Sequence, residues 1–281
     1  MPELPEVETT RRGLQAAVLG ARITQVTVRR HDLRMPIPKR LAGALKGTRI
    51  TDVRRRAKYL LIDLDSGETL LIHLGMSGSM RIEKAAKYVP KTHDHVMFSL
   101  ETGVLAVLHD PRRFGLIDLL KPGQEAIHPL LAHLGPEPLS KDFSAAYLAK
   151  QLARCSGPIK PALMDQKRVV GVGNIYASEC LHLAGIHPQE PAKNVVKQSD
   201  KIIAAIRKTL KAAIESGGSS LRDYVGAGGE GGYFQHKFLV YGRDGQPCFR
   251  CGTLIENGVQ SGRASYWCPQ CQPLRGFRRK T

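Results

Sequence analysis

The chain has 281 residues, a formal net charge of +17 and six cysteines. At roughly 150 residues per domain this length predicts about two domains. With 42% apolar residues the chain can bury a core without relying on disulfides. No apolar run approaches the ~18–20 residues of a membrane-spanning helix, and the opening residues, MPELPEVETTRR, lack the apolar stretch of a secretory signal.

The charge balance, 42 Lys and Arg against 25 Asp and Glu, favours a polyanionic partner such as nucleic acid. An anionic membrane surface is a competing interpretation, which would require a basic amphipathic helix. The best candidate, residues 198–215, has only the charge of an ordinary amphipathic helix. A basic protein without any polyanionic partner is the third possibility, and we expect nucleic acid and no membrane.

The first 120 residues predict one helix followed by many short strands. The helix covers residues 6–19, with Val7, Leu14 and Val18 on one side. Runs rich in β-branched and aliphatic residues then predict strands at 22–30, 59–64, 69–74, 95–100, 104–109 and 116–120. Such a series favours a two-layer antiparallel sandwich over βαβ units.

Beyond Gly135 the pattern becomes helical, and a cysteine-bearing segment ends the chain. Helices are predicted at 142–154, 160–165, 174–185 and 198–216, and a glycine-rich stretch follows at 226–232. We therefore expect an α+β protein with three parts. These are a β-sandwich with flanking helices (1–135), a helical domain (136–235) and a cysteine module with a basic tail (236–281).

The four C-terminal cysteines predict a metal site. Cys248-x2-Cys251 and Cys268-x2-Cys271 are separated by sixteen residues, a spacing typical of four-thiolate zinc sites. Four thiolates close the zinc tetrahedron, so the ion would be structural and would stabilise a module too small to bury its own core. Two disulfides are the alternative. A hairpin turn is expected at Asn257-Gly258, between the two pairs.

Two further segments have a functional and an ordinary interpretation. Gly171 and Gly173 precede a helix with Asn174 as its expected N-cap, and exposed amides at such a start bind phosphate; a plain loop-to-helix connection is the alternative. Once Met1 is removed, Pro2 would offer an amine that is far more often neutral than lysine and can attack carbon. Glu3 would shuttle protons, although both residues also suit an ordinary helix start.

Seven motifs together resemble one family, the bacterial formamidopyrimidine-DNA glycosylases. They are the terminal four-cysteine finger and PELPEVE (2–8), RRAKYLL (55–61), LGMSGS (74–79), HDHV (93–96), DPRRFG (110–115) and GVGNIYASE (171–179). They follow the family order over nearly the whole chain. The related endonuclease VIII branch begins Pro-Glu-Gly-Pro-Glu and lacks the Arg-Arg-Phe segment, so Leu4 and Arg112-Arg113-Phe114 favour the first branch.

The resemblance implies a catalytic role for four residues. Pro2 would be the Schiff-base nucleophile that attacks C1′ of the damaged nucleotide, and Glu3 the acid that assists ring opening. Lys58 would donate a proton during strand cleavage and contact phosphate. Arg263 would assist the second elimination and hold the phosphate near the lesion. The middle domain would contain the helix–two-turn–helix motif of the family.

Other residues would contact DNA or replace the extruded base. Met76, Arg112 and Phe114 match the trio that fills the gap left by the everted base. The residues that match DNA contacts are His93, Arg113, Lys160 and Asn174. The segment at Cys155 lacks a lysine run found in some relatives, and Arg154 is the candidate to replace it.

The expected function is therefore that of a bifunctional enzyme of base-excision repair. It would excise 8-oxoguanine and formamidopyrimidines from double-stranded DNA and then cleave the strand by β,δ-elimination. It would act as a monomer with one structural zinc ion in the bacterial cytosol. An endonuclease-VIII-like enzyme for oxidised pyrimidines and a non-catalytic zinc protein that binds damaged DNA are the alternatives.

Overall fold

The computed structural model describes residues 2–219 and 232–275. The tail from residue 276 and all but the last residue of the expected glycine-rich stretch lie outside these ranges. The chain forms two compact units, each discontinuous in sequence. The first combines residues 1–132 with 214–235, and the second combines 133–213 with 236–281.

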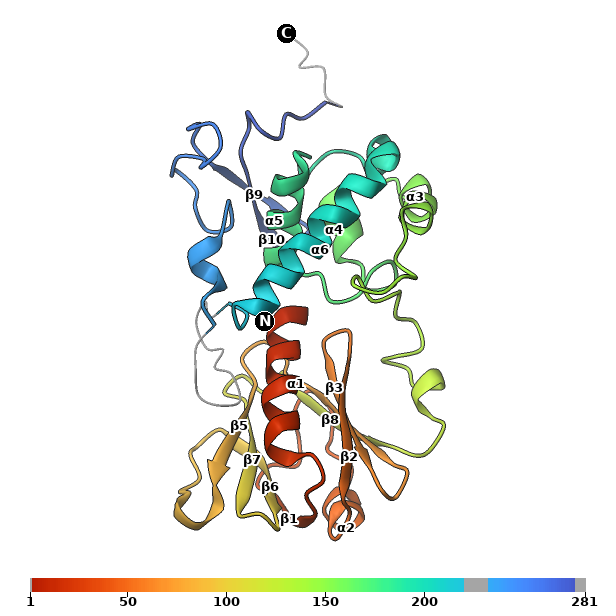
Figure 1. Cartoon of the computed structure of the whole chain (residues 1–281), viewed down its shortest axis with the longest axis vertical. Helices are drawn as coiled ribbons and strands as arrows, with labels where there is room; N and C mark the ends of the chain where they lie inside the picture. The colour runs from red at the N-terminus through yellow and green to blue at the C-terminus, as the bar shows by residue number, and fades with distance from the viewer. Residues whose placement is uncertain (1, 220–231, 276–281) are drawn as a thin grey trace. The chain divides into compact units, whose positions relative to one another are not determined.

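The first unit is a sandwich of two four-stranded antiparallel sheets, which confirms the predicted architecture (Figure 1). One sheet has the order β1 (Ile23–Val28), β6 (Asp94–Leu100), β7 (Val104–His109) and β5 (Ser79–Lys84). The other has the order β2 (Ile50–Arg56), β3 (Tyr59–Leu64), β4 (Thr69–His73) and β8 (Leu116–Leu120). Apolar residues of both sheets form one core, among them Phe98, Leu108, Leu60 and Ile72.

Two helices cover edges of this sandwich. Helix α1 (Leu4–Val18) contacts β2 and β3 of one sheet and β5 and β7 of the other, so it bridges two edge strands. Its apolar stripe, which includes Leu4, Val7 and Leu14, is buried in the core. Helix α2 (Leu41–Leu45) packs on β1, and short 3-10 turns occur at Ala85–Lys87 (η1) and Glu125–Ile127 (η2).

The second unit is largely helical. Its helices are α3 (Ala145–Ala153), α4 (Ile159–Met164), α5 (Asn174–Ala184) and α6 (Ser199–Glu215), which ends where the first unit resumes. The 3-10 segment η3 (Ala192–Gln198) also belongs to this unit, and η4 (Phe234–Lys237) includes the residues at which the chain passes from the first unit back to the second. A hairpin of β9 (Glu256–Gln260) and β10 (Arg263–Trp267) follows, and β10 packs on α5. No helix within the described ranges is long and apolar enough to cross a bilayer.

Two local predictions were wrong. The hairpin turn lies at Ser261-Gly262, where both residues have positive φ as a type I′ turn requires, and not at Asn257-Gly258. Gly258 lies inside β9 next to the Trp267 ring, and a Cβ at residue 258 would lie 3.1 Å from the indole. The N-cap of α5 is Gly173, and Asn174 is the first helical residue.

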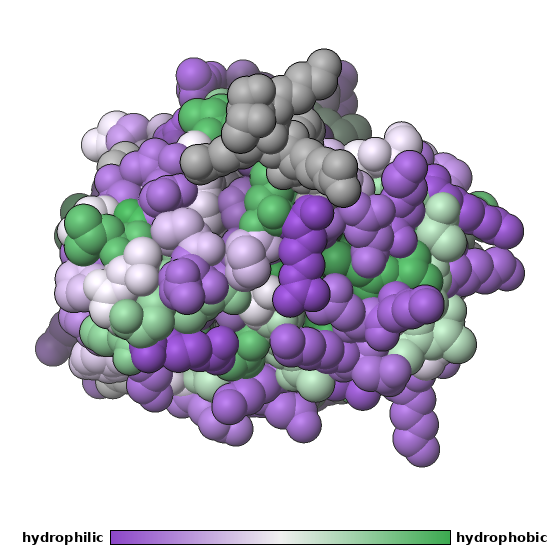
Figure 2. Space-filling model, turned by 90° about the horizontal axis from the view of Figure 1, so that it is seen from above, coloured by the Kyte–Doolittle hydropathy of each residue, from purple (hydrophilic) through white to green (hydrophobic). Residues whose placement is uncertain are grey.

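Hydrophilic side chains predominate on the face shown in Figure 2, where hydrophobic residues occupy separate patches. The sequence has 42 basic and 25 acidic residues. The excess of positive charge in the sequence suits contact with phosphates rather than insertion into lipid.

Candidate functional site

In the first unit, α1 runs antiparallel to β2, and this places the start of the helix at a defined end of the sandwich. Gln15 donates to Asp52 at 3.3 Å, and Arg11 donates to the carbonyl of Val53 at 3.1 Å. One turn earlier in the helix, Glu8 accepts from Arg55 at 3.1 Å. As the helix is followed back towards Pro2, the strand therefore advances towards the β2–β3 turn, where Lys58 lies.

The first turn of α1 is buried and held by carboxylates. Glu3, which is 2% exposed, and Glu6 form a capping box in which the Glu3 N–H donates to Glu6 Oε2 at 2.9 Å. The other oxygen of Glu6 accepts from the N–H and the hydroxyl of Ser219, at 2.8 and 3.0 Å. Pro2 is also buried. The expected nucleophile Pro2 and the expected acid Glu3 therefore lie at the start of a helix that hydrogen bonds hold in place. Glu6 is a site residue that the sequence analysis missed.

Lys58 and His73 lie at this same end. Lys58 is 7% exposed and is the second residue of the two-residue turn between β2 and β3. The first residue, Ala57, has a φ of 54°, which is unusual for a non-glycine residue. The neighbouring residue Tyr59 pairs with His73 in the sheet. Burial, together with the charges of Lys58 and Arg34, lowers the pKa of His73 to about 4.

His73 is therefore neutral at physiological pH and accepts a hydrogen bond at Nδ1 from the N–H of Gly75, 3.0 Å away. This bond fixes the start of the loop that presents Met76. Sequence reasoning missed His73, although its place directly before the LGMSGS motif was an available signal.

Two adjacent loops present the predicted gap-filling residues. Met76 is 42% exposed on the loop after β4, and Phe114 is 44% exposed on the loop after β7. The guanidinium of Arg112 lies 5.1 Å from the centroid of the Phe114 ring, a cation–π arrangement. Arg113 is exposed and has a φ of 59°. The structure thus presents two large apolar side chains and two cations to solvent on adjacent loops.

His93 is exposed just before β6, and its ring lies 5.9 Å from that of His109. His109 donates from Nδ1 to the buried carboxylate of Asp94 at 2.9 Å. Burial alone would raise the pKa of Asp94, but hydrogen bonds from Tyr88 and the Lys91 backbone, among others, hold it below its ordinary value. An ionised Asp94 therefore orients His109, which contacts the predicted DNA-binding residue.

In the second unit, Lys160 and Arg263 belong to one cluster. Lys160 is only 1% exposed, and its Nζ donates to Ala264 O at 2.8 Å and to Ser265 Oγ at 2.7 Å. Arg263 is exposed at the start of β10. Both line a cavity of about 310 Å³ together with Met164. Lys160 thus anchors β10, while its predicted contact with DNA stays a prediction.

The start of α5 is joined to the segment before the finger. Asn174 Nδ2 donates to the hydroxyl of Tyr241 at 3.3 Å, and the Tyr241 and Tyr266 rings lie 5.0 Å apart. The carboxylate of Glu179 accepts from three successive backbone N–H groups, those of residues 239–241, at 2.8–3.0 Å. Burial nevertheless raises the pKa of Glu179. Glu179 was missed because its partners lie about sixty residues away.

Arg154 is the remaining predicted DNA contact of the second unit. It is exposed at the C-terminal end of α3. Within the described part of the chain, no hydrogen bond or ion pair joins it to Lys160, Asn174 or Arg263. Its assignment rests on the sequence resemblance.

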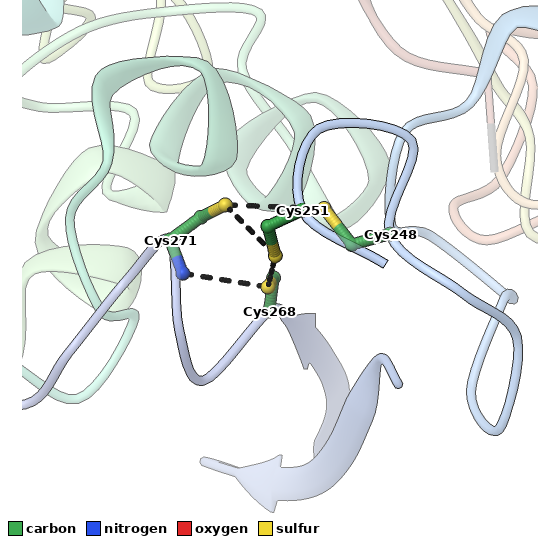
Figure 3. A group of neighbouring side chains, drawn as sticks. All are labelled: Cys248, Cys251, Cys268 and Cys271. Carbon is green, nitrogen blue, oxygen red and sulfur yellow. Dashed lines mark hydrogen bonds between the residues drawn. The ribbon is translucent and has the colours of Figure 1, made fainter. Parts of the chain in front are cut away.

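The four predicted metal ligands converge, as Figure 3 shows. Cys271 Sγ lies 3.9 Å from Cys248 Sγ and 3.5 Å from Cys251 Sγ, and Cys251 and Cys268 are 3.4 Å apart. Zinc–sulfur bonds of ~2.3 Å in a tetrahedron separate the sulfurs by ~3.8 Å, so the cluster fits one zinc ion. Four protein ligands leave no open position, which makes the site structural.

Three successive segments of the chain match domains of known protein families. Residues 1–117 match the formamidopyrimidine-DNA glycosylase N-terminal domain, 134–225 the H2TH domain of that enzyme, and 245–274 the zinc finger found in FPG and IleRS. A formamidopyrimidine-DNA glycosylase of Cereibacter sphaeroides is 50% identical over 97% of this chain and 100% of its own length.

Solved structures also match nearly the whole chain. The MutM (Fpg) protein of Thermus thermophilus superposes with a TM-score of 0.87 at 40% identity, over 97% of this chain and 99% of its own. Lactococcus lactis Fpg bound to abasic-site DNA gives 0.90 at 34% identity, over 96% and 99%. The same protein bound to DNA with N7-benzyl-Fapy-dG gives 0.89 at 34%, over 97% and 100%.

Proposed function

Because the chain belongs to the formamidopyrimidine-DNA glycosylase family, we propose that it excises oxidised purines from duplex DNA and then cleaves the strand. The substrates would be 8-oxoguanine and formamidopyrimidines, and the products a free base and a one-nucleotide gap. The observation that supports this most directly is the antiparallel run of α1 and β2, which brings the start of the helix to the end of the sandwich where Lys58 and the Met76 loop lie.

The proposed first step uses Pro2 as a nucleophile. After removal of Met1, its secondary amine attacks C1′ of the damaged nucleotide, and the bond from C1′ to the base breaks. Opening of the sugar ring gives an iminium, and protonation of the ring oxygen by Glu3 assists it. The capping box supports this assignment, because it fixes the Glu3 backbone next to the amine.

The following eliminations break the strand on both sides of the sugar. The iminium acidifies the C–H at C2′, and loss of that proton expels the 3′ phosphate. Loss of a second proton, from C4′, through the conjugated system then expels the 5′ phosphate. Lys58 in the first unit and Arg263 in the second are the cations proposed to assist these departures. The exposed position of Arg263 suits contact with a phosphate.

Borohydride trapping tests the proposal. Reduction of an iminium joins the enzyme to abasic DNA, so the processed wild-type protein should give a stable adduct. Pro2→Gly should lose most of it, because a primary amine on a flexible residue replaces the fixed secondary amine. Glu3→Gln should strongly reduce base excision. Glu101→Gln changes an exposed carboxylate of the first unit and is the matched control.

The same assay separates the alternatives. Binding of damaged DNA without any adduct would indicate a non-catalytic damage-binding protein. An adduct with faster excision of thymine glycol than of 8-oxoguanine opposite cytosine would indicate an endonuclease-VIII-like enzyme. We further propose action as a monomer in the bacterial cytosol, where the DNA substrate lies; sedimentation with and without DNA tests the stoichiometry.

A further inference from the structure

We infer that Ser77 and Asp110 are positioning residues which join the loops of Met76 and of Arg112 and Phe114 into one preformed platform. This platform would set the preference of the enzyme for the base opposite the lesion. The inference rests on the proposed function, because it assigns the gap-filling role to these loops.

A buried carboxylate links the two loops. Asp110 is fully buried, and its Oδ1 accepts from the Ser77 hydroxyl at 3.0 Å. Its Oδ2 accepts from the N–H of Gly115 at 2.7 Å. Ser77 Oγ in turn accepts from the N–H of Arg112 at 3.3 Å. One carboxylate and one hydroxyl therefore bind the loop after β4 to both ends of the Arg112–Phe114 segment.

The loop backbones also touch directly. Gly75 has a φ of +66°, and a Cβ at this position would lie 2.3 Å from the carbonyl carbon of Phe114. A Cβ at Gly115 would lie 2.9 Å from Asp110 Oδ2. Glycine at these two sites permits a separation that no side chain would allow, so the loops pack as one body.

The platform is fixed to the first sheet as well. The N–H of Asp110 donates to the carbonyl of His93 at 2.9 Å. His95 Nε2 lies 2.8 Å from the carbonyl of Asp110 and donates to it, since that oxygen can only accept. Asp110 thus connects the loops to the strand start that carries His93.

Rigid placement matters most for discrimination. Arg112 can distinguish opposite bases only if its donors are held where the correct base presents acceptors. A loosened loop adapts to either base, so the difference in transition-state binding narrows. Attack on an abasic site in single-stranded DNA requires no gap filling, because no partner base is left behind.

The test compares Ser77→Ala with wild type on three substrates. They are duplexes with 8-oxoguanine opposite cytosine, duplexes with 8-oxoguanine opposite adenine, and a single-stranded abasic oligonucleotide trapped with borohydride. We expect excision opposite cytosine to fall about tenfold, the equivalent of one or two lost hydrogen bonds in the transition state. The cytosine-to-adenine rate ratio should fall towards one, while single-strand trapping stays at the wild-type level.

Two variants isolate the role of the link. Asp110→Asn keeps both bonds if its oxygen accepts from Gly115 and its amide donates to Ser77, so it should retain most of the discrimination. Thr69→Val removes another hydroxyl–carboxylate bond of the same unit, from Thr69 to Asp63 at 2.7 Å, and should leave the rate ratio unchanged.

An unchanged rate ratio in Ser77→Ala would overturn the inference. So would an equal loss on all three substrates, because that pattern indicates general destabilisation. The proposed function fails separately, if the wild-type protein neither traps abasic DNA nor excises 8-oxoguanine.

Discussion

The ammonium of Lys160 and the hydroxyl of Ser265 are 2.7 Å apart, in a part of the second unit where Lys160 is almost fully buried. The second acceptor of this ammonium, the carbonyl of Ala264, lies in the same strand. Both of these acceptors are uncharged groups of the hairpin. The position of the Lys160 ammonium is better suited to holding the strand that carries Arg263 than to contacting a phosphate.

Salt dependence separates these two roles. Each phosphate contact adds ~0.9 to the slope of log K against log salt. Arg263→Gln should therefore reduce this slope by ~0.9, the value of one phosphate contact. Lys160→Met should weaken binding at every salt concentration and leave the slope unchanged. Fluorescence anisotropy over a range of about 50 to 200 mM salt measures both. A reduced slope for Lys160→Met would show direct contact instead.

Substitution of Glu6 should disturb the start of α1. Its carboxylate accepts from the N–H of Glu3 and from the N–H and the hydroxyl of Ser219. The NH2 group of a glutamine at this position cannot accept a hydrogen bond, so it would face at least one of these donors. We expect Glu6→Gln to lower the free energy of unfolding by about 2 kcal/mol and to reduce borohydride trapping. Urea denaturation measures the first effect. Equal stability of Glu6→Gln and wild type would show that these bonds contribute nothing net.

Removal of zinc should abolish DNA binding. The core around the finger contains only Val240, Ile255 and two cysteines as buried residues within the described part of the chain, so metal binding must provide much of the folding free energy. Chelation should release one zinc ion per chain and abolish the gel shift, and added zinc should restore it. Cys268→Ser should behave like chelated protein and Cys155→Ser like wild type. Full affinity in metal-free protein would contradict the prediction.

The neutral state of His73 predicts a loss of stability in mild acid. Its pKa is about 4 in the folded protein and 6.5 when unperturbed, so the unfolded chain binds more protons between these values. Stability should therefore fall as the pH drops from about 6.5 to about 4, by up to ~3 kcal/mol from this residue. Thermal unfolding of wild type and His73→Gln across this range measures the difference. Parallel curves would refute the assignment.

Strand prediction succeeded where the residues are apolar on both faces or alternate clearly. The runs at 59–64, 104–109 and 116–120 match the strand bounds. Strands β2 and β5 were not predicted because they contain many charged residues, as in ITDVRRR and SMRIEK. These side chains remain partly exposed, and pairing with β3 and β7 rather than their own propensity makes them strands.

The metal ligands and the exposed loop residues were predictable because local spacing and motifs identify them. Residues that act through distant partners were not. Glu6 accepts hydrogen bonds from Ser219, and Glu179 accepts them from residues 239–241. No local sequence pattern indicates contacts between residues so far apart in the chain. The burial of Lys160 was equally hidden, since its acceptors lie more than one hundred residues away.

The discontinuous first unit limits how the protein can be divided. A fragment that ends near residue 132 contains both sheets and α1 but lacks residues 214–235. Glu6 would then lose both bonds from Ser219 and the packing of Gly218 against its side chain. Recombination between homologues should respect this dependence: a chimaera that exchanges the N-terminal segment needs the matching residues 214–219 from the same parent.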